Sequence, residues 1–235
     1  AILESLNCIK ENRPTNAGIL LFGKNTQKFF MNAYIALARY GTKEVDVKRL
    51  DYKEFAGNLF QQIDNCAKYI KENTSVMSQL RKDSVQRDDI PEYGWFSIRE
   101  LITNAICHRD YSNPKGNEVA IFKDRIEIYN PGKFPEDVHP EDFFKGGGRS
   151  ILRNPLIAET MYKSRDIEKW ASGLKRIHEE CITAQVRVEF QQRHQVPPRL
   201  QEPADGRGGD AFAERRGNAA GDENVLGHRP PHASL

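Results

Sequence analysis

The sequence contains few of the features that mark the simplest protein classes. Among its 235 residues there are only four cysteines, scattered so widely that no CxxC pair or Cys/His cluster forms. Neither a zinc site nor a disulfide framework is suggested, and a reducing cytoplasm is the expected compartment. No apolar run is long enough to cross a membrane, and we expect no signal peptide.

Neither positive nor negative charge is in large excess. The formal net charge is only +2, although 29% of the residues are charged. This balance gives no whole-chain electrostatic argument for binding nucleic acid. The hydrophobic fraction of 38% is modest, but a chain of this length still buries a real core, in one large domain or two small ones.

Residues 1–85 are predicted to form an α/β segment. The opening "AILESLNCIK" reads as the middle of a helix without an initiator methionine, so we expect a fragment of a longer chain. "AGILLFG" (17–23) and "AYIALARYG" (33–41) are typical of buried strands. "YKEFAGNLFQQIDNCAKYIKEN" (52–73) has apolar residues at helical spacing and predicts a long amphipathic helix.

Residues 86–191 are predicted to form a second α/β unit, entered through the charged connection "RKDSVQRDDIPEYG". Its clearest element is the hairpin "NEVAIFKDRIEIYN" (117–130), whose apolar residues alternate on either side of a turn at Lys123-Asp124. Helices are predicted over 154–164 and 173–184, and a last strand over 186–190.

Residues 192–235 differ in texture from the rest of the chain. They contain no lysine, no isoleucine and a single aromatic residue, Phe212. Such a segment buries too little apolar surface to offset its ordering entropy, so we expect an irregular or disordered tail. The shift in residue usage also suggests a reading-frame change, and an Arg/Gly arm that binds RNA is the alternative.

Two short motifs resemble well-known sites but lack essential residues. In "GILLFGKN" the glycines and Lys24 follow the phosphate-loop pattern, yet the intervening residues are apolar and Asn25 replaces the hydroxyl that a phosphate loop needs. "HRD" at 108–110 follows a kinase catalytic loop, but Lys115 stands where that loop has its metal-binding asparagine. Both interpretations are set aside.

The stretch "SIRELITNAICHRDY" (97–111) is the most informative one. It places Glu100, Asn104 and His108 at four-residue intervals beside an apolar face, and we call these three residues the polar stripe. One interpretation is structural: Ser97 and Glu100 form a capping box, and the amide and imidazole bond to neighbouring loops. The other is functional: a carboxylate orients or deprotonates a water, while an amide oxygen one turn away ligates Mg²⁺ on a nucleotide.

The spacing E-x-x-x-N resembles the N-box of the GHKL ATPases, the superfamily of gyrase B, MutL and the histidine kinases. The blocks "RELITNAICHRDYS", "DRIEIYNPGKFP", "GGGRSILRNPLIAETMY" and "IEKWASGLKRIHEEC" follow the order of one family. That family comprises transcriptional regulators related to the RecG ATP-dependent DNA helicase, with a divergent histidine-kinase-type ATPase domain. The resemblance covers about residues 1–191.

The resemblance implies a Bergerat-type α/β sandwich in which helices and a mixed sheet enclose ATP and Mg²⁺. Glu100 would activate water, and Asn104 would bind Mg²⁺. The other residues implied or suggested as nucleotide contacts are His108, Asn130, Pro131, Gly132, Arg149, Arg153, Ser172, Gly173 and Leu174.

Two departures from the family pattern favour an alternative. Asn130 stands where the superfamily has its adenine-binding aspartate, and Ala171 where it has a glycine. The alternative is a degenerate module that binds no nucleotide and serves protein or DNA contacts. Helicase activity is not expected, because paired phosphate-loop motor domains are missing. DNA contacts are expected through parts of the whole protein outside this sequence, and a homo-oligomer is possible.

Overall fold

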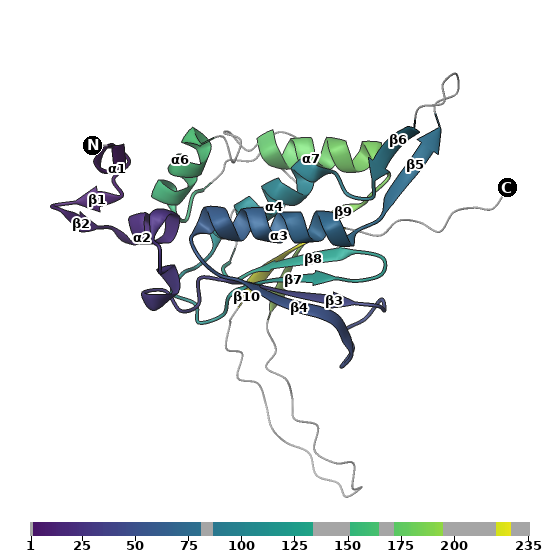
Figure 1. The fold of residues 1–235 in the computed structure, drawn as a ribbon, viewed down its shortest axis with the longest axis horizontal. Helices are drawn as coiled ribbons and strands as arrows, with labels where there is room; N and C mark the ends of the chain where they lie inside the picture. Colours follow the sequence, from purple (N-terminus) through teal and green to yellow (C-terminus); the bar gives the residue numbers. More distant parts are fainter. Residues whose placement is uncertain (1, 81–86, 134–150, 165–171, 195–219, 227–235) are drawn as a thin grey trace, which may run out of the picture.

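The computed structural model describes residues 2–80, 87–133, 151–164, 172–194 and 220–226 (Figure 1). The helical elements are α1 (Ile2–Ser5), α2 (Asn16–Phe22), the 3₁₀ helix η1 (Thr26–Lys28), α3 (Leu59–Asn73), α4 (Trp95–His108), α6 (Pro155–Lys163) and α7 (Ser172–Thr183). The strands are β1 (Ile9–Lys10), β2 (Arg13–Pro14), β3 (Ile35–Tyr40), β4 (Arg49–Phe55), β5 (Val76–Leu80), β6 (Arg87–Pro91), β7 (Asn117–Ile121), β8 (Ile126–Asn130), β9 (Val188–His194) and β10 (Ala220–Leu226).

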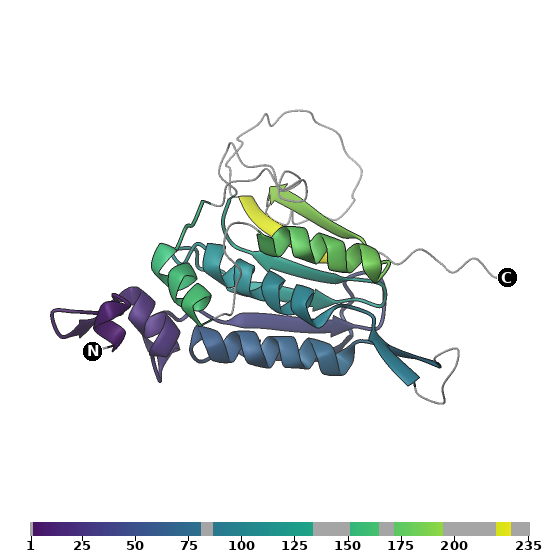
Figure 2. The ribbon, with the colours of Figure 1, turned by 90° about the horizontal axis from the view of Figure 1, so that it is seen from above.

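A six-stranded mixed sheet forms one layer of the molecule. Its strand order is β4-β3-β7-β8-β10-β9, with β3 and β7 parallel and the other neighbours antiparallel. Helices α3, α4 and α7 lie side by side across one face, and no described helix covers the other (Figures 1 and 2). The predicted α/β sandwich with a mixed sheet is confirmed.

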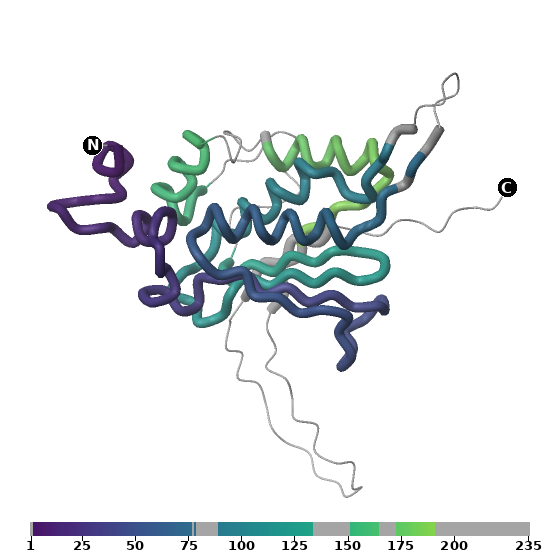
Figure 3. The backbone as a smooth tube through the Cα atoms, in the orientation of Figure 1, coloured from purple at the N-terminus to yellow at the C-terminus, as the bar shows by residue number. Residues whose placement is uncertain are grey.

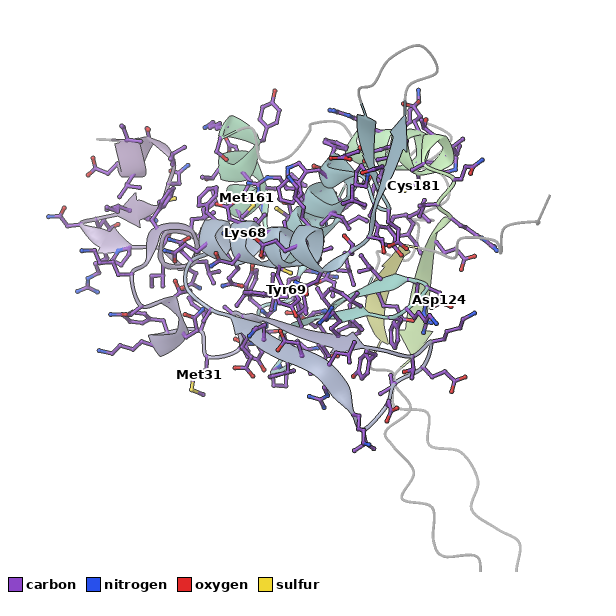
Figure 4. All side chains as sticks on the ribbon, turned by 45° about the vertical axis from the view of Figure 1, so that its right-hand side comes forward. Met31, Lys68, Tyr69, Asp124, Met161 and Cys181 are labelled. Atoms are coloured by element: carbon purple, nitrogen blue, oxygen red, sulfur yellow. The ribbon has the colours of Figure 1, made fainter. Side chains whose placement is uncertain are left out.

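The core lies between these helices and the sheet. Helix α4 buries Ile98, Leu101, Ile102, Ala105 and Ile106, which recur at helical spacing. Figure 4 shows Tyr69, Met161 and Cys181 within the body of the molecule. Truncating one such buried leucine or isoleucine to alanine typically costs about 2–5 kcal/mol, so this layer dominates stability.

Several predicted elements are confirmed. The hairpin of β7 and β8 pairs Ile121 with Ile126, as the alternation predicted. Helix α3 opens with a capping box between Asn58 and Gln61, whose side chains each bond the other's backbone N–H. Strand β3 and helix α6 fall in their predicted ranges, and helix α7 is shifted from its predicted range by one residue.

Two predictions in the N-terminal segment are wrong. The run 17–23 is helix α2 rather than a strand, because Thr15 caps its start by accepting from Gly18 N–H at 3.1 Å, and Gly18 packs on the Cys8 carbonyl where a Cβ would overlap it. The predicted helix 52–73 begins only at Leu59, since 49–55 pair with β3 as β4.

Residues expected to be connection or tail also contribute strands. The charged connection holds β6, which pairs with β5 in a hairpin that leads from α3 to α4 and projects from one end of the molecule (Figure 1). The N-terminal helix α1, purple beside the N in Figure 3, lies at the other end. In the predicted tail, residues 192–194 extend β9 and 220–226 form β10 between β8 and β9. These two stretches pair with neighbouring strands through their backbones, which the composition of the tail did not predict. The remaining tail lies outside the described residues.

Candidate functional site

The N-terminal end of α4 is held by α7. Its N-cap is Gly94, which has no side chain to bond the first turn. The Glu180 carboxylate supplies that acceptor instead, taking the Ser97 backbone N–H at 2.8 Å and the Ser97 hydroxyl as well. The proposed capping box of Ser97 and Glu100 is therefore wrong, because Ser97 lies inside the first turn and Glu100 nearly a turn further on.

Glu100 lies at the contact between α4 and α7. Its side chain is only 4% exposed, and it packs against the first turn of α7 so closely that a Cβ on Gly173 would overlap its Oε1. Asn104, one turn along α4, donates its Nδ2–H to the same Oε1 at 3.1 Å. The structure thus brings together Glu100, Asn104 and Gly173, which the sequence predicted to share a site.

The third member of the polar stripe, His108, is the last residue of α4 and is half-buried. Burial, followed by the positive charge of Arg153, lowers the pKa of His108 from 6.5 to about 4. The imidazole is therefore neutral at physiological pH. It can donate or accept a hydrogen bond there, but it supplies no positive charge to a phosphate.

The turn after β8 lies against the C-terminal end of α4. The Asp110 N–H donates to the Pro131 carbonyl at 2.7 Å. Gly132 has φ +151°, which favours glycine, and any Cβ there would overlap the Arg153 guanidinium. That guanidinium donates to the His108 carbonyl at 2.7 Å and to the Lys133 carbonyl, so Arg153 fastens the turn to the helix rather than standing ready for phosphate.

Asn130, the predicted adenine contact, is the last residue of β8 and is 4% exposed. Its Oδ1 accepts from Asn117 Nδ2 at 3.2 Å, and the same Asn117 nitrogen donates to the Ala105 carbonyl at 3.4 Å. The amide of Asn130 therefore helps tie β8 to β7 and α4. Asn130 thus lies at the end of the candidate site where the adenine contact was predicted, but its amide carries no negative charge.

Sequence reasoning missed the residues that position α4, namely Glu180 and Asn154. The Asn154 side chain donates to the Cys107 and Arg109 carbonyls at 2.9 and 2.8 Å, which caps the helix end. Asn154 directly precedes Pro155 at the start of α6. An asparagine before a proline that begins a helix is a recognisable sequence signal, but it predicts a cap for α6 and not for α4. Nothing local marks Glu180.

Two of the predicted nucleotide contacts have side chains that the structure does not describe. Arg149 and the side chain of Ser172 lie outside the described residues. Within the described ranges, no group of three or more His, Cys, Asp or Glu side chains could hold a metal ion, and no helix is long and apolar enough to span a membrane. A pocket of about 420 Å³ opens elsewhere, between α1, the β1–β2 hairpin, α2 and η1.

Comparisons with known proteins agree with this architecture. No curated protein matches the sequence. The fold is similar to that of the DIP2311 protein from Corynebacterium diphtheriae, with a TM-score of 0.68 at 18% identity over 97% of this chain. The present chain spans 41% of that protein's length.

The family comparison falls on the downstream half of the candidate site. Residues 115–195 match the family model described as "Putative ATP-dependent DNA helicase recG C-terminal". The match includes the β7–β8 hairpin and α7 and begins after the polar stripe. The predicted resemblance to a RecG-related, ATPase-like domain is therefore confirmed over residues 115–195.

Proposed function

We propose that residues 86–191 form a GHKL-type ATP-binding domain of a RecG-related, DNA-associated transcriptional regulator in the cytoplasm. The observation that carries the proposal is the meeting of Glu100, Asn104 and Gly173. These residues come from the N-box-like stretch and from the second glycine turn, and they lie in one contact between α4 and α7. A helix that only packed would have little reason to bury a carboxylate beside a partly exposed amide.

Asn104 fits the role of a Mg²⁺ ligand. Its Nδ2 is used in the bond to Glu100, so its Oδ1 is the atom left to face a cation. Mg²⁺ needs only one or two protein oxygens when phosphate oxygens and waters complete its octahedron. When bound, the ion would supply positive charge at the phosphate oxygens.

Glu100 fits the role of the group that orients and deprotonates the attacking water. Its Oε1 is held by the amide of Asn104, so the carboxylate has a fixed direction before any substrate enters. A fixed carboxylate can take a proton from water at the moment when the water attacks phosphorus. The first turn of α7, beside Gly173, offers backbone N–H groups that can face phosphate oxygens.

The proposal is tested by titrating the full chain with a fluorescent ATP analogue in the presence of Mg²⁺. We expect saturable binding that is lost in Asn104→Ala and kept in Asn65→Ala, an exposed asparagine on the neighbouring helix α3. In Glu100→Gln, binding should persist while any hydrolysis falls, because the amide cannot accept the proton. Absence of binding at millimolar nucleotide would reject the proposal.

Two observations favour a second candidate, a degenerate module that contacts protein or DNA without a nucleotide. The buried amide of Asn130 presents no charged acceptor to an adenine amino group and is already bonded to Asn117. The Arg153 guanidinium also covers Gly132. Under this candidate the titration shows no binding to wild type, and Asn104→Ala changes stability alone.

A further inference from the structure

A second site lies outside the polar stripe, in the pocket of about 420 Å³ at the N-terminal end of the molecule. We call it the N-terminal pocket. Its walls come from α1, the β1–β2 hairpin, α2 and η1, so it shares no element with the proposed ATP site. Its volume falls within the range of small-ligand sites, roughly 300–1,000 Å³.

The walls of the N-terminal pocket are fixed by internal bonds. Thr26 is fully buried, and its hydroxyl bonds to the Ile19 and Gly23 carbonyls, each at 3.2 Å. This pins the turn 23–29 to the end of α2. At the other end of α2, the Thr15 N–H donates to the Cys8 carbonyl at 3.0 Å, which joins the β1–β2 hairpin to the helix. Because the walls are already ordered, binding a ligand should cost little further conformational entropy of the protein.

The charged side chains that line the pocket are basic, although the chain as a whole is nearly neutral. Two acidic residues, Glu4 on α1 and Glu11 in the turn of the β1–β2 hairpin, belong to the elements that form the walls but do not line the pocket. Lys24 and Lys28 line the pocket, and no acidic side chain lines it. The pocket therefore favours an anionic ligand.

Exposed apolar side chains surround the same opening. Phe22 and Phe29 line the pocket with 40% and 63% of their surfaces exposed. Phe22 also contacts Phe60 on α3, with ring centroids 5.9 Å apart, which fixes the orientation of its free face. Met31, close by in sequence, is 82% exposed and points away from the body (Figure 4). Aromatic rings exposed beside lysines are typical of surfaces on which unpaired bases stack.

We propose that the N-terminal pocket binds single-stranded nucleic acid. A base stacks on Phe29 or Phe22, and the adjoining phosphates lie near Lys24 and Lys28. The charged lining residues are both lysines. A lysine ammonium group is a compact point charge, and it can bind a phosphate oxygen from several directions. A concave site with a ring at its mouth takes a base that is free of a duplex.

The test is fluorescence anisotropy of labelled oligothymidylate and oligouridylate titrated with the full chain at several salt concentrations. We expect saturable binding that weakens with salt. Replacing both pocket lysines, Lys24→Gln and Lys28→Gln, should lower the steepness of the salt dependence by about 1.4, at about 0.7 per phosphate contact. The control pair Lys68→Gln and Lys175→Gln removes two exposed lysines from α3 and α7 and should leave it unchanged.

The aromatic contribution is tested separately. Phe29→Leu keeps an apolar side chain but removes the ring, and we expect roughly a tenfold loss of affinity, whereas Phe29→Tyr should retain binding. Phe29 is exposed, so thermal unfolding should show both variants folded. Oligothymidylate and oligouridylate bound equally would indicate recognition of base and phosphate alone, and a preference for one would identify the sugar that fits.

Three results would overturn the proposal. The first is no saturable binding of either oligonucleotide at low salt. The second is an equal loss in the pocket and control lysine pairs. The third is binding that survives all pocket changes, which would place the nucleic-acid site elsewhere on the chain. Binding of an acidic peptide in place of either oligonucleotide would make the partner a protein.

Discussion

The two ends of helix α4 are anchored in opposite ways. At the N-terminal end, a carboxylate from α7, Glu180, accepts two hydrogen bonds from Ser97. At the C-terminal end, Asn154 and Arg153 donate to the carbonyls of Cys107, His108 and Arg109. Each arrangement satisfies the groups that a helix leaves unpaired at that end, and each places the favourable charge against the helix dipole.

This difference indicates that separate contacts hold the two halves of the candidate site, although both halves share α4. The Glu180 contact holds α7 against α4, and so sets how Gly173 meets Glu100. The Arg153 contact holds the turn after β8, and so sets how Gly132 meets His108. Damage at one end should therefore disturb one half of the site more than the other.

The largest effect is expected at the N-terminal end. Glu180→Ala leaves the buried N–H and hydroxyl of Ser97 without their acceptor and removes a charged partner. We expect the free energy of unfolding to fall by about 2–3 kcal/mol in urea denaturation. Glu179→Ala, next in the chain and ion-paired only at the surface with Lys175, should cost less than about 0.5 kcal/mol. Equal losses would contradict the anchoring role of Glu180.

A smaller effect is expected at the C-terminal end. Asn154→Ala removes two neutral hydrogen bonds to carbonyls at the end of α4, and we expect a loss of about 1–2 kcal/mol. Arg153→Gln should cost less, because the bonds of Arg153 are exposed to water. Chemical denaturation of both variants gives the comparison. If Arg153→Gln proves the more damaging, the end is held by charge and this interpretation is wrong.

Much of the sheet and the main helices could be predicted because their signals are local. Alternation in 117–130 requires only that one face of a hairpin be buried, and the periodicity of α3 survives even though its first turn was misplaced. The run 17–23 was assigned wrongly because a short apolar stretch fits a strand or a buried helix equally well. What decided between them was the hydrogen bond that Thr15 Oγ1 accepts from the Gly18 N–H, together with the packing of Gly18, and periodicity reports neither.

In the candidate site, too, the residues with local signals could be predicted and those that act on another helix could not. Glu100 and Asn104 could be paired from their spacing, since residues four apart lie on the same face of a helix. Glu180 and Asn154 could not be found, because each acts on a helix other than its own. The neutral state of His108 was equally hidden, since it depends on burial and on an arginine 45 residues away.

The smallest effect is expected from the protonation of His108 as the pH falls. His108 has a folded pKa of about 4, below its ordinary value of 6.5, so the unfolded chain takes up the proton first as the pH falls. Stability is therefore lost progressively from about pH 6.5 down to about pH 4, and about 1 kcal/mol of it should be gone between pH 7 and 5.5. His108→Gln should lack this loss in urea denaturation at the two pH values.

This pH window separates His108 from its neighbour Asp110. Bonds from Ser112 lower the pKa of Asp110 below 3.8, so its stabilising contribution is present above that value and is lost only at lower pH. Arg153→Gln should remove part of the His108 effect and leave the rest, because burial is the larger cause of the shift and the arginine charge the smaller. If wild type and His108→Gln lose equal stability between pH 7 and 5.5, the imidazole is not held neutral at this end of α4.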